Sequence, residues 1–376
     1  MSKRSNNQGS VSQRSDGRWQ ARVTLPNGKR KAVYTKTRRE ADKKLREMLT
    51  GLDQGIMPSD NRQTIEQYLN SWLESIKHQI EPSTYLVYLS HIRRIIQEFS
   101  KLPLAKLTPQ AVQAFYAKKI AEGLALTTVN RMHATLKMAL KDAVRMEILS
   151  RNIAELVKAP KYEPAEKRVL NEQEAVRLLQ SARGERMEAF YVLVLSTGMR
   201  LGELLVLQWQ DIDFLNGVLH VRRGLQYTPD GYRVTNPKSR MSRRTIALAP
   251  HVVVALQEHR QRQEVEKEKL GEYWDVEGDF VFLNMKGQQK HPNYVERHEL
   301  PMLLKKAGLP KIHFHDLRHT AATLLLRNGV HVKVVSEMLG HSSIAITLRI
   351  YAHVLPDMQR DAANVASRLF GGIDGK

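Results

Sequence analysis

The chain has 376 residues, of which 42% are hydrophobic, and a formal net charge of +20 from 59 Lys and Arg against 39 Asp and Glu. It contains no cysteine, which excludes disulfides, thiolate zinc sites and cysteine nucleophiles. No apolar run approaches the ~18 residues of a membrane span, and the N-terminus has no signal-peptide core. We therefore expect a cytoplasmic protein of two or three domains that does not enter a membrane.

The positive charge predicts a polyanionic partner, because Lys and Arg gain affinity by displacing the counterions of phosphate groups. A basic protein without such a partner is the alternative. The charge is densest at the start of the chain, where the first 60 residues hold 14 Lys and Arg against 6 Asp and Glu. This segment is the first candidate for a nucleic-acid contact.

Residues 1–55 are expected to form one small domain of three strands and a helix. Thr37 and Glu40 have the spacing of a capping box and predict the start of the helix. The strands, separated by Asp-Gly and Pro-Asn-Gly turns, are expected at Gly9–Gln13, Arg18–Thr24 and Lys29–Thr35.

Such a basic sheet fits a DNA groove, although a platform for another protein is the alternative. The candidate DNA contacts are the basic residues of its strands, Arg18, Arg22, Lys29, Arg30 and Lys31.

A linker at residues 51–62 leads to a helical domain at residues 62–157. Apolar spacing and Thr or Pro at the helix starts predict a four-helix bundle, with helices at Thr64–Ile76, Pro82–Phe99, Thr108–Glu122 and Leu126–Ile148. The basic residues on its later helices form either a solvated face or a set of DNA phosphate contacts: Lys118, Lys119, Arg131, Lys137 and Lys141.

A second linker at residues 158–168 precedes a larger domain at residues 165–376. We expect helices at Asn171–Arg183 and Met187–Thr197, then short strands at Ile212–Phe214, Val218–Val221 and Arg244–Leu248. The expected fold class is therefore multidomain and mainly α with small β parts: a three-stranded sheet plus helix, a helical bundle, and a mixed α+β domain.

Three segments of the last domain place polar residues within apolar helical sequence. They are STGMRLGELLVLQW (196–209), HFHDLRHTAATLLL (313–326) and LGHSSIAITLRIYAHV (339–354). Arg200 and Glu203 are three residues apart and predict an ion pair on one helix face, which by itself fits a structural role. His315, Arg318 and His319 also share one helix face.

Two kinds of site compete for these residues. His315 and His319, with His313 and His341, have the spacing of helical zinc ligands. However, Arg318 would place a fixed positive charge beside the cation, which is unfavourable. An anion site uses the guanidinium and imidazole groups without this conflict. We therefore expect an anion site with neither a metal nor a cofactor.

The three segments resemble the motif boxes of the tyrosine recombinase (phage integrase) family, of the arm-binding type found in phages and integrative transposons. The boxes T-G-x-R-x-x-E, H-x-L-R-H and L-G-H-S-(x)-T-x-x-x-Y are matched by Thr197, Gly198, Arg200 and Glu203, by His315, Leu317, Arg318 and His319, and by Leu339, Gly340, His341, Ser342, Thr347 and Tyr351. A family lysine in a turn of the small sheet corresponds to Lys238, although the usual Lys-Thr pair is Lys-Ser here.

Upstream, residues 62–157 resemble the family's core-site binding domain, and residues 9–50 resemble the arm-site binding domain of larger integrases. The resemblance therefore implies a site-specific DNA recombinase that integrates or excises a mobile element.

The resemblance also implies the chemistry. Tyr351 attacks the scissile phosphodiester, which leaves a 3′-phosphotyrosyl link and a free 5′-hydroxyl, and resealing needs no ATP. Arg200, Arg318 and His341 stabilise the transition state. Lys238 protonates the leaving oxygen, and His315 takes the proton from Tyr351.

Glu203 holds Arg200 in place, and His319 has a supporting role. The implied partners are double-stranded DNA with core and arm sites, an excisionase, and a host DNA-bending protein. The resemblance further implies a homotetramer on DNA in which the amphipathic segment Pro356–Phe370 docks in trans. Two rival functions remain: a non-catalytic DNA-binding protein of this fold and a relaxing topoisomerase. The arm-like N-terminal segment favours an integrase over a resolvase-like or topoisomerase role.

Overall fold

The computed structural model describes residues 9–24, 30–53, 63–162, 168–235, 243–274, 278–351 and 358–370. The chain divides into two compact units, residues 1–164 and 165–376, and each is described by itself. Within the described ranges, no helix is both long and apolar enough to cross a membrane.

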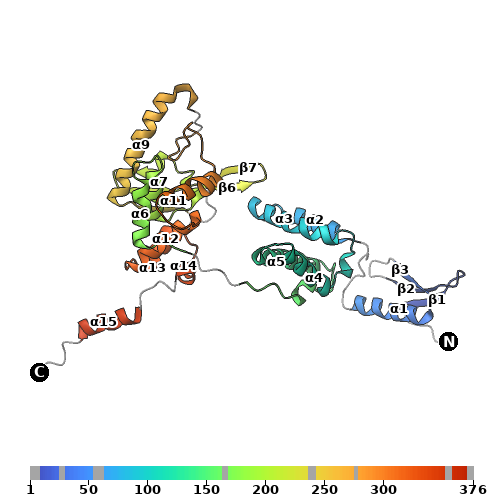
Figure 1. The fold of residues 1–376 in the computed structure, drawn as a ribbon. Helices are drawn as coiled ribbons and strands as arrows, with labels where there is room; N and C mark the ends of the chain where they lie inside the picture. Colours follow the sequence, from blue (N-terminus) through green and yellow to red (C-terminus); the bar gives the residue numbers. More distant parts are fainter. Residues whose placement is uncertain are drawn as a thin grey trace. The chain divides into compact units, whose positions relative to one another are not determined.

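The first unit begins with a three-stranded antiparallel sheet that packs against one helix (Figure 1). Ala21 and Val23 alternate along the middle strand and are buried against Ala41 and Leu45 of the helix. The elements are β1 (Ser10–Gln13), β2 (Trp19–Thr24), β3 (Arg30–Thr35) and α1 (Arg38–Asp53). The predicted sheet and helix are thus confirmed.

The face of this sheet opposite α1 carries basic and aromatic side chains. The register pairs Arg22 with Ala32 and Gln20 with Tyr34, and paired residues point to the same side, so Arg22 shares a face with Tyr34. The guanidinium of Arg18 lies 5.9 Å from the centroid of the exposed Tyr34 ring. This face therefore offers cations beside a flat ring.

The other candidate contacts of this segment divide between the two faces. Arg30 pairs with Thr24 and belongs to the basic face. Lys31 pairs with Val23, whose side chain is buried against α1, so Lys31 belongs to the face that bears the helix. Lys29 lies outside the described residues.

Four helices form the bundle of the first unit: α2 (Ile65–Ile76), α3 (Pro82–Phe99), α4 (Pro109–Ala121) and α5 (Leu126–Arg145). Thr64 and Thr108, which we expected as first helical residues, are N-caps whose hydroxyls accept backbone hydrogen bonds of 3.2 Å. The last helix ends at Arg145 rather than Ile148, and Glu147 beyond it has a left-handed φ of 59°.

The second unit is built around α7 (Glu188–Thr197), which is buried between α9 (Pro250–Leu270) and α12 (Phe314–Arg327) (Figure 1). Its further helices are α6 (Glu172–Ala182), α8 (Leu201–Leu204), α10 (Pro292–Tyr294), α11 (Leu300–Lys306), α13 (Val332–Leu339), α14 (Ile344–Tyr351) and α15 (Met358–Phe370).

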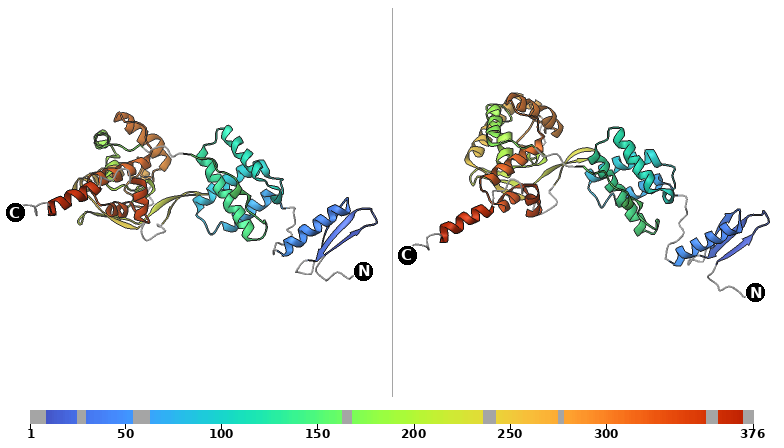
Figure 2. Two further views of the ribbon diagram at one scale, coloured as in Figure 1. Left: turned by 90° about the horizontal axis from the view of Figure 1, so that it is seen from below. Right: turned by 60° about the horizontal axis from the view of Figure 1, so that its bottom comes forward.

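The predicted small sheet is present as β4 (Ile212–Asp213), β5 (Val218–Val221) and β8 (Arg244–Ala247), in the order β4-β5-β8. A hairpin of β6 (Gly224–Thr228) and β7 (Gly231–Thr235) was not predicted. It extends outward from the rest of its unit (Figure 2).

Two glycines with left-handed backbone allow a matched stability test. Gly198 follows α7 with a φ of 62°, and a Cβ there would lie 2.6 Å from Cδ2 of the buried Leu339. Gly217 has a φ of 60°, but a Cβ there would have no neighbour closer than 3.7 Å. The two sites therefore share the backbone strain and differ in the space available.

We expect Gly217→Ala to lower the free energy of unfolding by about 1–2 kcal/mol, which is the cost of left-handed backbone. Gly198→Ala should cost about 1–3 kcal/mol more, because Leu339 has to move. Urea denaturation of both variants measures the difference. Equal losses would show that Leu339 does not restrict this position.

Candidate active site

Arg200 and Glu203 meet at the start of α8. Arg200 is the residue before the helix and has extended backbone, and Glu203 is its third residue. The Glu203 carboxylate accepts from the Arg200 backbone N–H at 3.0 Å and from Arg200 Nη1 at 2.7 Å. The predicted pair is present, but as a cap of the helix N-terminus rather than as two positions on one helix face.

A second arginine binds the same carboxylate. Arg244, at the start of β8, donates from Nη1 to Glu203 Oε1 at 3.0 Å and from Nη2 to Oε2 at 2.8 Å. Burial raises the pKa of Glu203, but the hydrogen bonds and charge of Arg244, with the charge of Arg200, outweigh it and hold the pKa at about 2. Glu203 is therefore ionised at any physiological pH.

The C-terminal end of α13 is held by three guanidinium groups, each of which donates to a different one of three consecutive backbone carbonyls. These carbonyls lie at the negative end of the helix dipole, which favours cations there. The contacts are Arg244 Nε to Met338 O (2.6 Å), Arg318 Nη2 to Leu339 O (2.9 Å) and Arg200 Nη2 to Gly340 O (3.3 Å).

Arg318 of α12 is the most deeply placed of the three, with a relative exposure of 2%. Its Nη1 donates to Gly198 O at 2.8 Å, so it joins the first box to the third. Burial and the charge of Arg200 lower the pKa of Arg318 to about 9, which leaves it charged at neutral pH.

His341 follows the end of α13. Its Nδ1 lies 2.7 Å from Thr347 Oγ1, the threonine of the same box. Burial and the positive charges of Arg318, Arg200 and Arg244 lower the pKa of His341 to about 4. His341 is therefore a neutral hydrogen-bonding group at neutral pH.

Tyr351 is the last residue of α14 and is only 2% exposed. Its hydroxyl lies 2.7 Å from His319 Nδ1, and burial raises its pKa to about 12. His315 packs edge-on against His319, with ring centroids 4.7 Å apart. The family resemblance implied that His315 takes the tyrosine proton, whereas the Tyr351 hydroxyl contacts His319, one helical turn further along α12.

The alternative zinc site used these same histidines. His319 Nδ1 is already taken up by the Tyr351 hydroxyl. Within the part of the chain that the structure describes, no three His, Asp or Glu side chains are grouped so as to hold a metal ion.

Lys238 lies outside the described residues. Beside β5 and β8 a cavity of about 530 Å³ is lined by His220, Val221, Arg222, Arg223, Arg243, Arg244 and Thr245. The buried carboxylate of Asp211 holds Arg223 and lies 3.9 Å from Arg222. This basic recess was not predicted, although the paired arginines directly after a predicted strand were a signal for it.

The candidate DNA contacts of the bundle lie on its surface, and several have acidic neighbours. Lys118 pairs with Glu98 at 2.8 Å, and Lys119 pairs with Glu122 at 2.7 Å. Lys137 lies 3.8 Å from Glu155, while Arg131 and Lys141 are exposed. The Lys119 side chain is only 14% exposed. Lys118 and Lys137 form exposed ion pairs, which are weak, so these two lysines can exchange an acidic partner for a phosphate.

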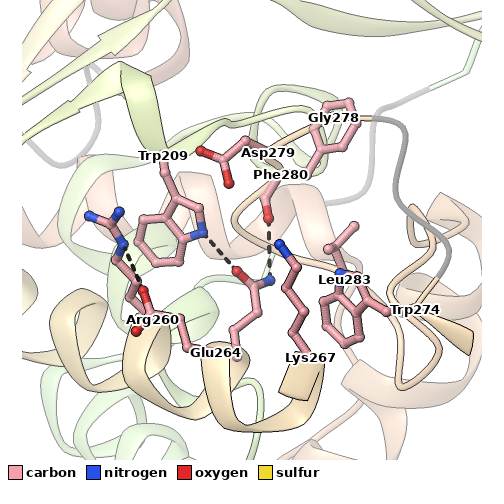
Figure 3. A pocket seen from close by; sticks show the side chains of 10 residues that line it. Trp209, Arg260, Glu264, Lys267, Trp274, Gly278, Asp279, Phe280 and Leu283 are labelled. Carbon is pink, nitrogen blue, oxygen red and sulfur yellow. Dashed lines mark hydrogen bonds and ion pairs between the residues drawn. The ribbon is translucent and has the colours of Figure 1, made fainter. Parts of the chain in front are cut away.

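A further cavity of about 240 Å³ lies between α9 and residues 278–283 (Figure 3). The Arg260 guanidinium lies 5.5 Å from the Trp209 ring, and Trp209 Nε1 donates to Gln263 at 2.7 Å. No catalytic candidate lines this cavity. It is therefore separate from the arginine cluster, by which we mean Arg200, Arg244 and Arg318 at the end of α13.

Comparison with known proteins agrees with this geometry. The family model described as phage integrase family matches residues 168–358, and the model described as phage integrase N-terminal SAM-like domain matches residues 64–120. A tyrosine recombinase XerC-like protein of Caldanaerobacter subterraneus subsp. tengcongensis is 32% identical over 367 residues, which cover 92% of this chain and 93% of that protein.

An integrase of Streptomyces ambofaciens is 28% identical, with 94% of each chain covered. The Tn1549 transposon integrase, solved in complex with a circular intermediate DNA, has a TM-score of 0.67 at 25% identity and covers 80% of this chain and 98% of that one. A lambda integrase tetramer bound to a Holliday junction shares the fold, with a TM-score of 0.58 at 22% identity over 93% of this chain and 96% of that one. The chain belongs to the phage integrase family and is a site-specific, DNA-binding tyrosine recombinase of the kind carried by mobile elements.

Proposed function

We propose that the enzyme cuts and rejoins DNA with Tyr351 as its nucleophile, which yields a 3′-phosphotyrosyl link and a free 5′-hydroxyl. The observation that best supports this is the convergence of the three boxes. Arg200 and Arg318 bind consecutive carbonyls at the end of α13, His341 follows there, and Tyr351 ends the neighbouring α14.

The arginines suit a pentacoordinate phosphate. Negative charge grows on its non-bridging oxygens as the tyrosine attacks, and donors fixed beforehand stabilise that charge most. Arg318 is locked by two carbonyls, whereas the Arg200 side chain is 41% exposed and so remains accessible to DNA. Neutral His341 adds a hydrogen-bond donor without adding charge repulsion.

Two proton transfers accompany the exchange of bonds. As the Tyr351 oxygen bonds to phosphorus, its proton passes to the adjacent histidines His319 and His315, of which His319 contacts the hydroxyl in the DNA-free state. As the bond from phosphorus to the 5′-oxygen breaks, Lys238 supplies that oxygen with a proton. The phosphotyrosyl bond retains the phosphodiester energy, so the reverse steps reseal the strand without ATP.

The buried Tyr351 hydroxyl represents a resting state in this proposal. Tyr351 is buried and its hydroxyl contacts His319, so in this arrangement the hydroxyl cannot reach a phosphate of bound DNA. DNA binding must therefore shift α14 before cleavage. The high pKa of Tyr351 keeps the unbound nucleophile protonated.

The DNA contacts are divided among three segments in our proposal. The basic face of β1–β3 binds arm sites, the bundle at residues 62–157 binds core sites, and the domain at residues 165–376 holds the scissile phosphate. The basic recess beside β5 and β8 contacts the backbone near that phosphate.

Assembly is proposed to be a homotetramer on DNA that acts in the cytoplasm. Helix α15 exposes Val365, Leu369 and Phe370, and these apolar side chains fit a docking role on a neighbouring protomer. An excisionase and a host DNA-bending protein are the proposed accessory factors. The solved lambda integrase complexes, a tetramer on a Holliday junction and a dimer on a core site, support this kind of assembly.

We expect Tyr351→Phe to eliminate the covalent protein–DNA product and to leave DNA affinity nearly unchanged, because affinity is spread over many phosphate contacts. A suicide substrate nicked near the cleavage point, run on a denaturing gel, traps the intermediate. Tyr294→Phe, which changes an exposed tyrosine of the same unit, is the control and should keep the product.

A covalent band of full strength from Tyr351→Phe would show that another residue attacks. Absence of the band from the unaltered protein on its own recombination site would favour the non-catalytic alternative. Relaxation of supercoils without strand exchange between two sites would favour a topoisomerase.

We expect cleavage to proceed in excess chelator, because the arginines and histidines supply the positive field that a metal provides in many phosphoryl-transfer enzymes. The covalent-complex assay with and without chelator measures this directly. Loss of product that only added metal restores would contradict the proposal.

Deletion of residues 1–55 should abolish binding to arm-type sites and leave weak cleavage at core sites, since the arm-binding face lies in this segment. Footprinting over the whole recombination site locates the loss. The double variant Arg22→Ala/Arg30→Ala tests the same face with the sheet intact, and Arg39→Ala on α1 is its control. Unchanged protection of every segment by the truncated protein would refute the arm assignment.

A further inference from the structure

The arginine cluster contains one member to which neither the motif boxes nor the family comparison assigns a role. We propose that Arg244 is a positioning residue for DNA cleavage, which aligns Arg200 through Glu203 and holds the end of α13 from which His341 projects. The inference rests on the proposed cleavage chemistry and adds a residue to it.

The contacts of Arg244 join the first box to the third. Its two terminal nitrogens occupy both oxygens of Glu203, and its Nε donates to Met338 O at 2.6 Å. The same carboxylate holds Arg200 through a side-chain and a backbone contact. One guanidinium therefore couples the orientation of Arg200 to the position of α13.

The contact between Arg244 and Glu203 is buried and closely packed. The side chains of Arg244 and Glu203 are only 6% and 8% exposed, and a Cβ added at Gly340 would lie 3.0 Å from Arg244 Nη1. Glycine at this position thus leaves space for the guanidinium while it ends α13 in left-handed backbone, with a φ of 68°. A shift of Arg244 would be transmitted directly to the residue before His341.

Arg244 also sets the charge balance of the cluster. Two guanidiniums, those of Arg200 and Arg244, bind the Glu203 carboxylate, and Arg244 makes the two-point contact that is specific to a planar fork. Without Arg244, the buried Glu203 would keep Arg200 alone, and Arg200 would be drawn fully into neutralising it. The guanidinium that reaches solvent would then be less available to a phosphate.

The alternative is that Arg244 only stabilises the fold. The same unit offers a matched comparison. Arg186 also bonds both oxygens of a carboxylate, Glu266, and two carbonyls, those of Leu283 and Asn284. The ion pair of Arg186 and Glu266 lies outside the arginine cluster. A purely structural role predicts that loss of either arginine has similar consequences.

The test compares Arg244→Met and Arg244→Lys with Arg186→Met in single-turnover cleavage of the suicide substrate at saturating DNA. Measurements are made below the melting temperatures of all variants. We expect Arg244→Met to cleave about 10²-fold more slowly, since a displacement of about 1 Å costs that much. Arg244→Lys keeps the charge but loses the two-point contact and should recover only part of the rate. The cleavage rate of Arg186→Met should remain within about threefold of that of the unaltered protein, because a structural ion pair away from the site affects stability rather than chemistry.

The pH profile of cleavage provides a readout that loss of a purely structural residue would not change. Arg244 helps to hold the pKa of Glu203 at about 2, so its loss raises that pKa. Cleavage by Arg244→Met should therefore decline further as the pH falls from neutral into the mildly acidic range, because protonated Glu203 no longer orients Arg200. The unaltered protein and Arg186→Met should lack this additional decline.

Wild-type rate and pH profile in Arg244→Met would overturn the proposal, and so would equal rate losses in Arg244→Met and Arg186→Met. If Arg244→Met does not fold, Arg244→Lys provides the test, and full cleavage activity of that variant would also contradict the proposal. Failure of the proposed cleavage chemistry is distinguishable, because the unaltered protein would then form no covalent complex.

Discussion

The end of helix α13 is the point on which the rest of the catalytic unit depends. A helix C-terminus presents carbonyls that lack partners within the helix, and here three consecutive carbonyls are bound by arginines from α12, from the start of α8 and from β8. These arginines come from parts of the chain far apart in sequence. The same interaction therefore joins distant parts of the fold and brings together the arginines of the proposed phosphate site.

Placing three guanidiniums together in a partly buried site is electrostatically unfavourable, because like charges repel and burial disfavours each charged group. The buried carboxylate of Glu203 and the negative end of α13 offset this repulsion. Burial first, and then the neighbouring positive charges, still lower the pKa values of Arg318 and His341. The positive field that remains is the property that a phosphodiester in its transition state requires.

The proposed nucleophile, Tyr351, is subject to a different constraint. Burial raises the pKa of its hydroxyl to about 12 and keeps it from solvent, and the hydroxyl contacts His319. In the proposed mechanism, the groups that bind the phosphate are thus organised before DNA arrives, whereas the attacking group is not. A recombinase that forms covalent links to DNA benefits from this order, because cleavage then depends on a bound substrate.

The sequence by itself determined the helices of the first unit, the first two helices of the second unit, six of the eight described strands and the three boxes that end at Tyr351, because these depend on periodicity, caps and spacing within short segments. Even the Arg200–Glu203 pair was visible at a separation of three residues. Only the tertiary structure decided that Arg244 shares Glu203, 41 residues away, and that Met338, 94 residues away, accepts from it. It likewise decided that His319 contacts Tyr351 and that Arg222 and Arg223 line a recess. Local patterns report which residues are neighbours along one helix or strand, while contacts between elements follow from how the buried faces of those elements pack together.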